Sequence, residues 1–278
     1  MNTSILTALA MTAFAGNSLL CRMALVHTDI DPATFTSVRL LTGALVLWLI
    51  VAAKKDRTGS AGSWYSALAL FAYAAAFSFA YVRLSAATGA LLLFGAVQVT
   101  MIGVGLWKGE RLRGIQALGL ITAFGGLAGL LLPGLAAPPP GAAMLMLCAG
   151  MAWGVYSLRA KGAANPVGAT AGNFIRTVPF AAGLSLATLS QANPDVQGIA
   201  YAIVSGGLAS ALGYAIWYRA LRTLSATKAA TVQLSVPVIT ALAAIVLLGE
   251  AMTLRFVLAS AAVLGGIALI IVARESAR

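Results

Sequence analysis

Long runs of apolar residues, separated by short polar segments, make up almost the whole chain. Each run is close to the length of about 20 residues that a helix needs to cross the hydrocarbon core of a bilayer. The runs predict ten membrane-spanning helices, at approximately 3–26, 32–53, 63–83, 88–107, 114–132, 141–160, 167–189, 197–218, 229–248 and 254–273. The first run lacks a basic leader and an obvious cleavage site, so we expect it to be retained as a span. The pattern therefore predicts an all-α integral membrane protein.

Composition supports this interpretation. Of the 278 residues, 60% are hydrophobic and 9% are charged, whereas soluble domains average about 25% charged residues. The net charge of +11 would suggest a nucleic-acid partner in a soluble protein. Here the basic residues lie in short clusters between apolar runs, which indicates helix orientation instead. Cys21 and Cys148 both lie inside apolar runs, which favours small core residues over a disulfide or metal site. We expect no cofactor and no nucleic acid.

Residues 84–130 resemble residues 224–270 at a constant spacing of 140 residues. The shared motifs are Leu-Ser-Ala at 84 and 224, Gly-Glu at 109 and 249, and Gly-Gly at 125 and 265. An odd number of spans in each half turns the second half upside down, which is a common architecture of secondary transporters. We therefore expect two inverted five-helix repeats around a central cavity. Their predicted bounds are 1–133 and 141–278, joined by a proline-rich connector at 134–140.

The charge of equivalent loops supports this inversion. Basic residues are sparse around the first Leu-Ser-Ala and frequent around the second, and the bias is reversed at Gly-Glu. Basic loops stay in the cytoplasm, so the equivalent loops should lie on opposite sides of the bilayer. With a cytoplasmic N-terminus, only Arg83 and Arg255 fall in outer loops. We therefore predict that both termini are cytoplasmic.

Two segments carry a resemblance to a known family. The stretch LSATKAATVQLSVPVITALAAIVLLGE at 224–250 and the pair Trp153-Gly154 resemble the drug/metabolite transporter superfamily, in its ten-helix, EamA-like branch. Within that branch the chain is most similar to bacterial exporters of aromatic amino acids. The resemblance implies an inner-membrane location and a central cavity lined by spans one to four and six to nine. It also implies that spans five and ten are peripheral. A monomer would suffice for transport.

Aromatic and amide side chains within the spans are the candidates for substrate contact. Tyr73, Phe77 and Tyr81 recur every four residues on one face of the third span. Such a stripe commonly serves packing, but a tyrosine hydroxyl or an amide deep in a span needs a polar partner. That partner could be a facing helix or a substrate. The predicted substrate-binding residues are Asn17, Tyr73, Phe77, Tyr81, Phe94, Gln98, Trp153, Tyr156, Tyr214, Trp217 and Gln233.

Two arginines and a proline are assigned gating or structural roles. Arg39 and Arg176 lie inside the second and seventh spans, at related places in the two halves. A buried guanidinium could bind a substrate carboxylate with two parallel hydrogen bonds. Alternatively it could snorkel to the interface or bind carbonyls of neighbouring helices. Pro237 removes a backbone hydrogen bond inside the ninth span, which predicts either a flexible gating kink or a static one.

The acidic residues bear on the function. None of the seven Asp and Glu residues falls in the middle of a span, and Glu110 and Glu250 mark helix ends. This favours facilitated movement over tight ion coupling. From the aromatic side chains in the spans and from the resemblance, we expect the solutes to be small amphipathic metabolites, with aromatic amino acids as the first candidates. The alternative is a carrier of other amino acids, drugs or nucleotide derivatives, with or without proton coupling. An intramembrane hydrolase is disfavoured, because the spans lack an Asp pair, a Ser-His pair and a metal cluster.

Overall fold

A computed structural model describes residues 2–53, 62–107, 109, 114–134, 137–160, 165–221, 223–224 and 232–275. Within these ranges the chain is helical and has no strand. The helices are α1 (Thr3–His27), α2 (Pro32–Ala53), α3 (Trp64–Tyr81), α4 (Ala86–Trp107), α5 (Gly114–Leu131), α6 (Pro140–Ala160), α7 (Pro166–Ala187), α8 (Val196–Val204), α9 (Gly213–Leu221), α11 (Ser235–Leu248) and α12 (Leu254–Glu275). A short 3-10 helix, η1 (Leu189–Gln191), precedes α8, and a π-helical segment, η2 (Ser205–Leu212), joins α8 to α9.

A helix lies at each of the ten predicted spans. Eight of them are long and apolar enough to cross a membrane, counting α8, η2 and α9 as one span, Val196–Ala220. The seventh, α7, is 22 residues long but carries polar side chains such as Asn173 and Arg176 along its length. The ninth, α11, is shorter than predicted, with 14 residues. The all-helical membrane fold is confirmed, whereas ten full-length spans stay a prediction.

Local sequence sets where several helices begin and end. Side-chain oxygens of Asn2, Ser63, Asn165 and Asp195 accept hydrogen bonds from the first-turn N–H groups of α1, α3, α7 and α8. These residue types are preferred N-caps because the first N–H groups of a helix have no partner within it. Gly249 ends α11 with a φ of 62°, a left-handed conformation that glycine adopts without steric penalty.

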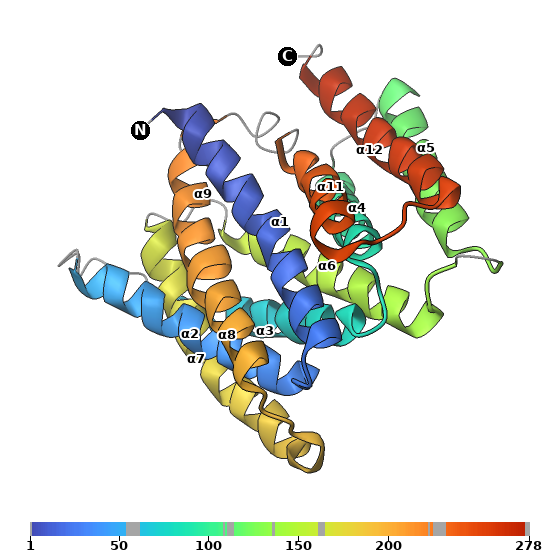
Figure 1. Cartoon of the computed structure of the whole chain (residues 1–278). Helices are drawn as coiled ribbons and strands as arrows, with labels where there is room; N and C mark the ends of the chain where they lie inside the picture. Colours follow the sequence, from blue (N-terminus) through green and yellow to red (C-terminus); the bar gives the residue numbers. More distant parts are fainter. Residues whose placement is uncertain are drawn as a thin grey trace.

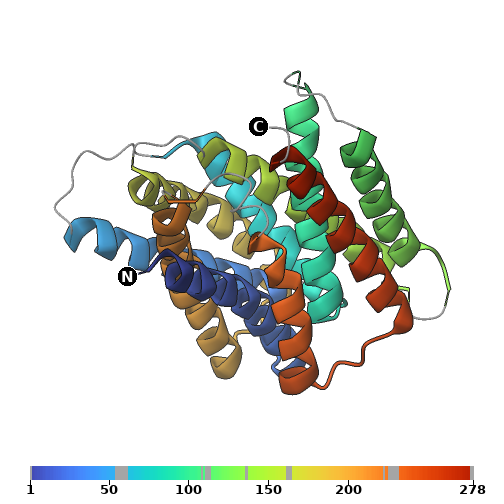
Figure 2. The same ribbon diagram turned by 90° about the horizontal axis from the view of Figure 1, so that it is seen from above.

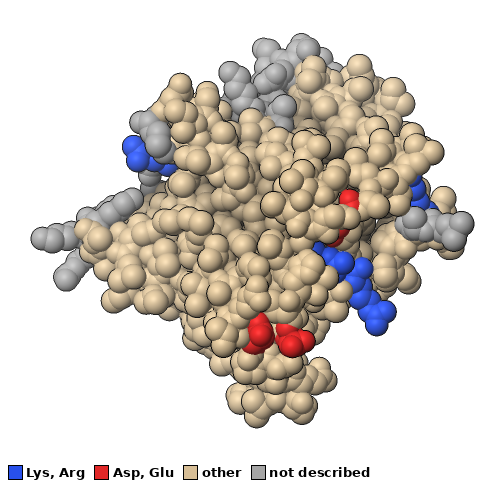
Figure 3. Space-filling model, viewed as in Figure 1, with Lys and Arg blue, Asp and Glu red and all other residues tan. Residues whose placement is uncertain are grey.

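The start of α1 and the end of α12 lie toward the same end of the bundle (Figure 1). We call the opposite end the distal end. The surface in view carries few charged side chains (Figure 3), and large apolar side chains such as Ile121 are exposed. An apolar exterior of this kind suits contact with lipid, because hydrocarbon offers no hydrogen bonds to polar groups.

Helices α5 and α12 pack closely against each other at one edge of the bundle (Figures 1 and 2). Glycines permit the close approach: a Cβ atom built on Gly119 would lie 2.5 Å from the carbonyl oxygen of Gly266. A Cβ on Gly126 would lie 2.8 Å from the side chain of Ala262 and 3.0 Å from the carbonyl oxygen of Ala259. Small residues let helices approach within lipid, where burial of apolar area alone drives no association.

The other helices also pack in matching pairs. Helix α3 packs on α6 and α7, while the α8–α9 span packs on α1 and α2. Helix α4 contacts α6, while α11 contacts α1. The pairs α2 with α7 and α4 with α11 complete the set. Exchanging the first five helices for the last five turns each of these contacts into another of them, whereas smaller contacts such as that of α1 with α4 have no counterpart of similar size in the described residues.

Two segments differ from their predicted form. The eighth span is interrupted by η2, where Gly206 lies so close to α2 that a Cβ atom there would collide with the carbonyl group of Arg39. Pro237 lies in the first turn of α11, because that helix begins at Ser235. First-turn N–H groups have no acceptor within the helix, so Pro237 removes no hydrogen bond from α11. Residues 232–233 before α11 are also helical, so the loss of a backbone hydrogen bond inside the ninth span stays a prediction.

Candidate functional site

Five polar side chains from four segments meet in the centre of the bundle, and we call them the central polar cluster. Arg39 on α2 donates from Nη2 to the hydroxyl of Tyr73 on α3 at 3.1 Å. It also donates from Nε to the hydroxyl of Ser210 in η2 at 3.3 Å. Asn17 on α1 donates to the same Tyr73 hydroxyl at 3.1 Å and accepts from Ser205 at 2.6 Å. The cluster therefore connects α1, α2, α3 and η2.

Arg39 is 1% exposed, and its guanidinium carbon lies 5.2 Å and 5.0 Å from the ring centres of Tyr73 and Phe77. Its Nη1 atom has no hydrogen-bond partner. Among the described residues, no carboxylate lies within ion-pair distance of it. The guanidinium therefore lies among aromatic rings and hydroxyls, with no neutralising charge in the described part of the site.

Aromatic rings form a wall beside the cluster. The ring of Trp153 lies 4.9 Å from Tyr73 and 5.0 Å from Tyr214, measured between ring centres. Phe14 stands edge-on to Tyr214 at 5.8 Å and to Trp217 at 6.0 Å. Offset and edge-to-face geometries are the favoured ones for aromatic pairs. The rings come from α1, α3, α6 and α9, so both halves of the chain contribute.

A cavity of about 20 Å³ lies between the cluster and the aromatic wall. It is lined by Phe14, Asn17, Ser18, Tyr73, Phe77, Leu93, Phe94, Trp153, Ala209 and Tyr214. This volume is close to the space that one water molecule requires. The centre is thus closed on itself in this conformation, and an organic solute needs the surrounding helices to separate.

The structure brings nine of the eleven predicted substrate-binding residues to this region. Asn17, Tyr73, Phe77, Phe94, Trp153 and Tyr214 line the cavity itself. Three more pack behind the lining. Tyr81 stands edge-on to Phe77 at 4.7 Å, Tyr156 lies 5.4 Å from Trp153, and Trp217 packs on Phe14. The Tyr81 hydroxyl donates to the carbonyl oxygen of Ala86 at 3.3 Å.

The remaining predicted residues lie elsewhere. Gln98 is buried one helical turn beyond Phe94 on α4, and its Nε2 atom has no hydrogen-bond partner. Gln233 is half-buried and precedes the start of α11. Neither of them lines the cavity. Arg176 donates to the carbonyl oxygen of Gly172 at 3.0 Å and lies 5.8 Å from the ring centre of Trp64. These contacts hold Arg176 against its own helix and the start of α3.

Sequence reasoning missed Phe14 and the two serines of η2. A serine in an apolar helix usually bonds a carbonyl of its own preceding turn, as Ser78 does with Ala74. Ser205 and Ser210 instead bond Asn17 and Arg39. The clustering of glycine and serine at 205–210, inside a predicted span, is the signal that could have indicated an irregular helix.

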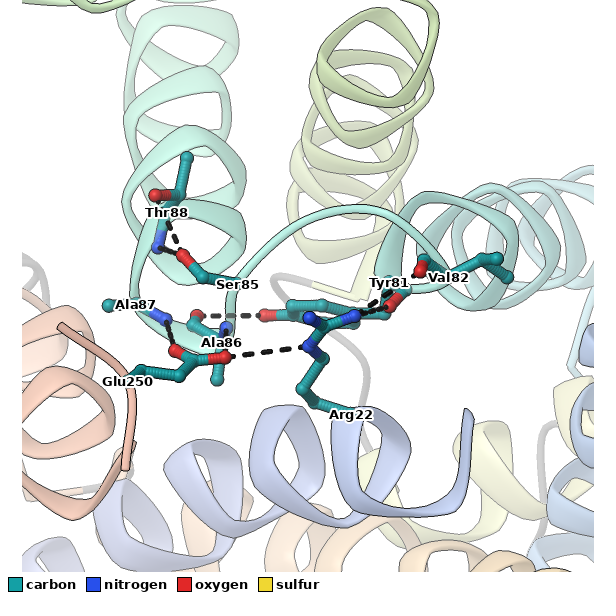
Figure 4. A network of polar contacts seen from close by, with 8 residues as sticks. All are labelled: Arg22, Tyr81, Val82, Ser85, Ala86, Ala87, Thr88 and Glu250. Carbon is teal, nitrogen blue, oxygen red and sulfur yellow. Dashed lines mark hydrogen bonds and ion pairs between the residues drawn. The ribbon is translucent and has the colours of Figure 1, made fainter. Parts of the chain in front are cut away.

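A second polar network joins Arg22 on α1 to Glu250 and to the start of α4, and we call it the distal latch (Figure 4). Glu250, just after α11, forms an ion pair with Nε of Arg22 on α1 at 3.4 Å. Its two carboxylate oxygens accept from the backbone N–H groups of Ala86 and Ala87 at 2.9 and 3.4 Å. These N–H groups open α4, and a helix N-terminus favours an anion. The sequence favoured a helix-end role for Glu250 over a coupling role and indicated no partner for it.

Arg22 extends the latch to a third helix. Its Nη1 atom donates to the carbonyl oxygens of Tyr81 at 2.9 Å and Val82 at 3.2 Å, at the end of α3 (Figure 4). A cavity of about 260 Å³ adjoins the latch, and Arg83, Ser85, Thr88, Glu250 and Thr253 are among its lining residues. Glu250 therefore belongs both to the latch and to the lining of this cavity.

Comparison with known proteins agrees with this architecture. The EamA-like transporter family matches the chain twice, over residues 1–132 and 140–272. An uncharacterized protein of Pseudomonas aeruginosa is 56% identical over 273 residues, which cover 98% of this chain and 95% of that protein. A protein of known crystal structure matches with a TM-score of 0.69 at 18% identity, over 97% of this chain and 98% of that one, which indicates a shared fold. The chain therefore belongs to the EamA-like transporter family, whose members are multi-pass membrane transporters of drug or metabolite type rather than enzymes.

Proposed function

We propose that this transporter moves small amphipathic metabolites, with aromatic amino acids as the first candidates, across the bacterial inner membrane by alternating access. The observation that carries the proposal is the central cavity, which has an aromatic wall on one side and a polar cluster on the other. Aromatic rings offer stacking faces to a planar apolar group, and the cluster offers hydrogen-bond donors to its polar end. Sites of this kind are largely apolar with a few convergent polar groups.

The proposal includes an inverted arrangement of the two halves, which would permit alternating access. The two matches to the family cover one half of the chain each, and they fit repeats at 1–133 and 141–278 joined by a connector at 134–140. The contact of Gly119 with Gly266 becomes that of Ala259 with Gly126 when the halves are exchanged at the spacing of 140 residues. Two such halves can rock about a shared site, so that the site opens to one side at a time.

The distal latch fits a gate in this cycle. The positive-inside pattern would put both termini in the cytoplasm and the latch on the outer face. Opening on that face requires Arg22 and Glu250 to separate, while opening on the other face leaves their ion pair intact. Most basic residues that carry the positive-inside argument, such as Lys54 and Arg111, fall outside the described residues. The orientation thus rests on the sequence pattern.

Transport by purified protein in liposomes tests the proposal. Labelled phenylalanine or tryptophan should move down its gradient without an imposed proton gradient. Uptake no higher than in empty liposomes would refute the substrate class, and a strict requirement for a proton gradient would refute facilitated movement.

Matched variants test the site itself. Trp153→Ala and Tyr214→Ala remove rings that line the cavity, and both should reduce transport at least tenfold if the rings contact the solute. Trp48→Ala is the control, because Trp48 is 53% exposed on the outside of the bundle. Equal losses in all three variants would show that the cavity assignment is wrong.

A further inference from the structure

We propose that Arg39 is the anion-binding residue of the central site, so that the transporter selects solutes carrying a carboxylate next to an apolar group. The inference rests on the proposed function, because it names the chemical class of the solute that the central site admits. The described part of the chain holds no carboxylate within ion-pair distance of Arg39.

Burial of the charged Arg39 side chain costs desolvation free energy. The side chain is 1% exposed and lies seven residues into α2, about two turns from its start at Pro32. An isolated charge in such surroundings is strongly disfavoured unless it is paired. Ionisable residues inside spans are rare for this reason, and they commonly mark a solute pathway.

The partners of Arg39 are neutral. A guanidinium has five N–H donors and no acceptor. Nε and Nη2 bond the hydroxyls of Ser210 and Tyr73, and Nη1 has no hydrogen-bond partner. The rings of Tyr73 and Phe77, at 5.2 and 5.0 Å, attract the cation but do not cancel its charge. A carboxylate would bind the guanidinium and also cancel its charge, because it accepts two parallel N–H bonds from an arginine and carries the opposite charge.

The surrounding side chains add donors. The Tyr73 oxygen already accepts from Asn17 and from Arg39, which leaves its own proton to donate. The Asn17 oxygen is occupied by the hydroxyl of Ser205. The cluster as a whole therefore has unused donors and a positive charge, which is the requirement for binding an anion.

The position of the charge relates it to the cavity. Tyr73 and Phe77 each contact the guanidinium and each line the cavity. Arg39 itself does not line the cavity in this conformation. A solute with its ring against Trp153 and Tyr214 would therefore reach the guanidinium when the helices separate and Tyr73 and Phe77 move aside. The related arginine of the second half, Arg176, is half-buried and bonds Gly172 of its own helix. This difference favours Arg39 over Arg176 as the anion-binding residue within the described part of the chain.

Binding measurements with a small series of ligands test the inference. We would titrate purified protein with 3-phenylpropionate, phenethylamine and hexanoate, which carry a ring with a carboxylate, a ring with an amine, and a carboxylate without a ring. Phenylpropionate should bind about 10- to 100-fold more tightly than phenethylamine, the range that one charge-assisted hydrogen-bonded pair provides. Equal binding of these two ligands would overturn the inference while leaving aromatic transport intact.

Variants of Arg39 separate binding from structure. Arg39→Met should remove the preference for the acid without weakening phenethylamine, and Arg39→Lys should restore part of it, because it keeps the charge but loses the paired geometry. Arg176→Met is the control and should keep the preference. A folded Arg39→Met protein that still prefers the acid would overturn the inference. If that variant does not fold, the ligand series on the wild-type protein decides.

The series also separates this inference from the proposed function. Hexanoate binding without binding of either ring compound would support the anion site and refute the aromatic substrate. Binding of phenethylamine alone would refute the anion site and support the aromatic wall. Binding of none of the three would count against both.

Discussion

Replacing Glu250 by alanine should loosen the distal end of the transporter. The Glu250 carboxylate joins three elements, because it pairs with Arg22 on α1 and accepts from the first two N–H groups of α4. The alanine variant removes all of these contacts at once. It leaves the left-handed turn at Gly249 unchanged. The change should therefore affect closure of the distal end more than the fold of α11.

The size of the effect can be worked from the geometry. Hydrogen bonds to a charged group contribute about 1.5–3 kcal/mol each when buried. The Arg22 and Glu250 side chains are 19% and 15% exposed, and two of the three contacts are 3.4 Å long. When the latch opens, hydrogen bonds to water therefore replace much of the free energy of these contacts. We take a net value of ~2 kcal/mol for the latch. Its loss should raise the population of the open state roughly 30-fold.

A native cysteine reports the opening. Cys21 precedes Arg22 on α1 and is fully buried, whereas Cys148 is exposed. In a Cys148→Ser background, a membrane-impermeant maleimide can label only Cys21. When opening and closing are fast relative to labelling, the labelling rate follows the population of the open state. Glu250→Ala should then label about 30-fold faster, and Glu250→Gln, which keeps one acceptor oxygen, should lie in between.

Asp29→Ala is the matched control, because Asp29 is an exposed acid in the loop after α1. It should label at the wild-type rate. The reasoning would be refuted if Glu250→Ala also labelled Cys21 at the wild-type rate while melting at the same temperature as the parent protein.

Two further predictions concern stability. Gly266→Val should lower the free energy of unfolding by about 1–3 kcal/mol, because the new side chain would meet the backbone of Gly119. Gly265 has open space beside it, so Gly265→Val should change little. Thermal melting of the two variants compares them directly. Burial alone would raise the pKa of Asp31, but hydrogen bonds from Thr34, Ala33 and the N–H of Asn193 hold that pKa below its ordinary value. The stabilisation is therefore present above the unfolded-state pKa and is lost as the pH falls through the lower folded-state pKa. Asp31→Ala should cost about 1 kcal/mol at neutral pH, and the difference in melting temperature from the wild type should shrink below about pH 4. A difference independent of pH would contradict the assignment.

The spans were predictable because membrane insertion depends on local hydropathy. Helix α2 begins and ends at the predicted residues, 32 and 53, since Pro32 and the charged run after Ala53 are local signals. The aromatic lining was predictable in part, because Tyr73 and Phe77 are four residues apart and so share one face of a regular helix. Periodicity alone left open whether that face met lipid, another helix or a cavity.

Pairings between distant residues could not be predicted in this way. Arg22 and Glu250 are 228 residues apart, and neither lies in a pattern that indicates the other. Ser210 reaches Arg39 because η2 departs from the α-helical period, so a helical wheel drawn through the eighth span places its side chains on the wrong face. The sequence resemblance of Arg39 and Arg176 suggested equivalent roles, yet burial separates them.

The π-helical segment also sets a constraint on chain length. In an α-helix each residue turns the chain by about 100°, and a π-helical stretch holds extra residues in the same number of turns. The rotational setting of α9, which aims Tyr214 and Trp217 at Phe14, therefore depends on how many residues η2 contains. Substitutions at lipid-facing positions such as Leu208, which is 58% exposed, leave that number unchanged. The segment should therefore tolerate substitutions better than insertions or deletions, which would rotate α9.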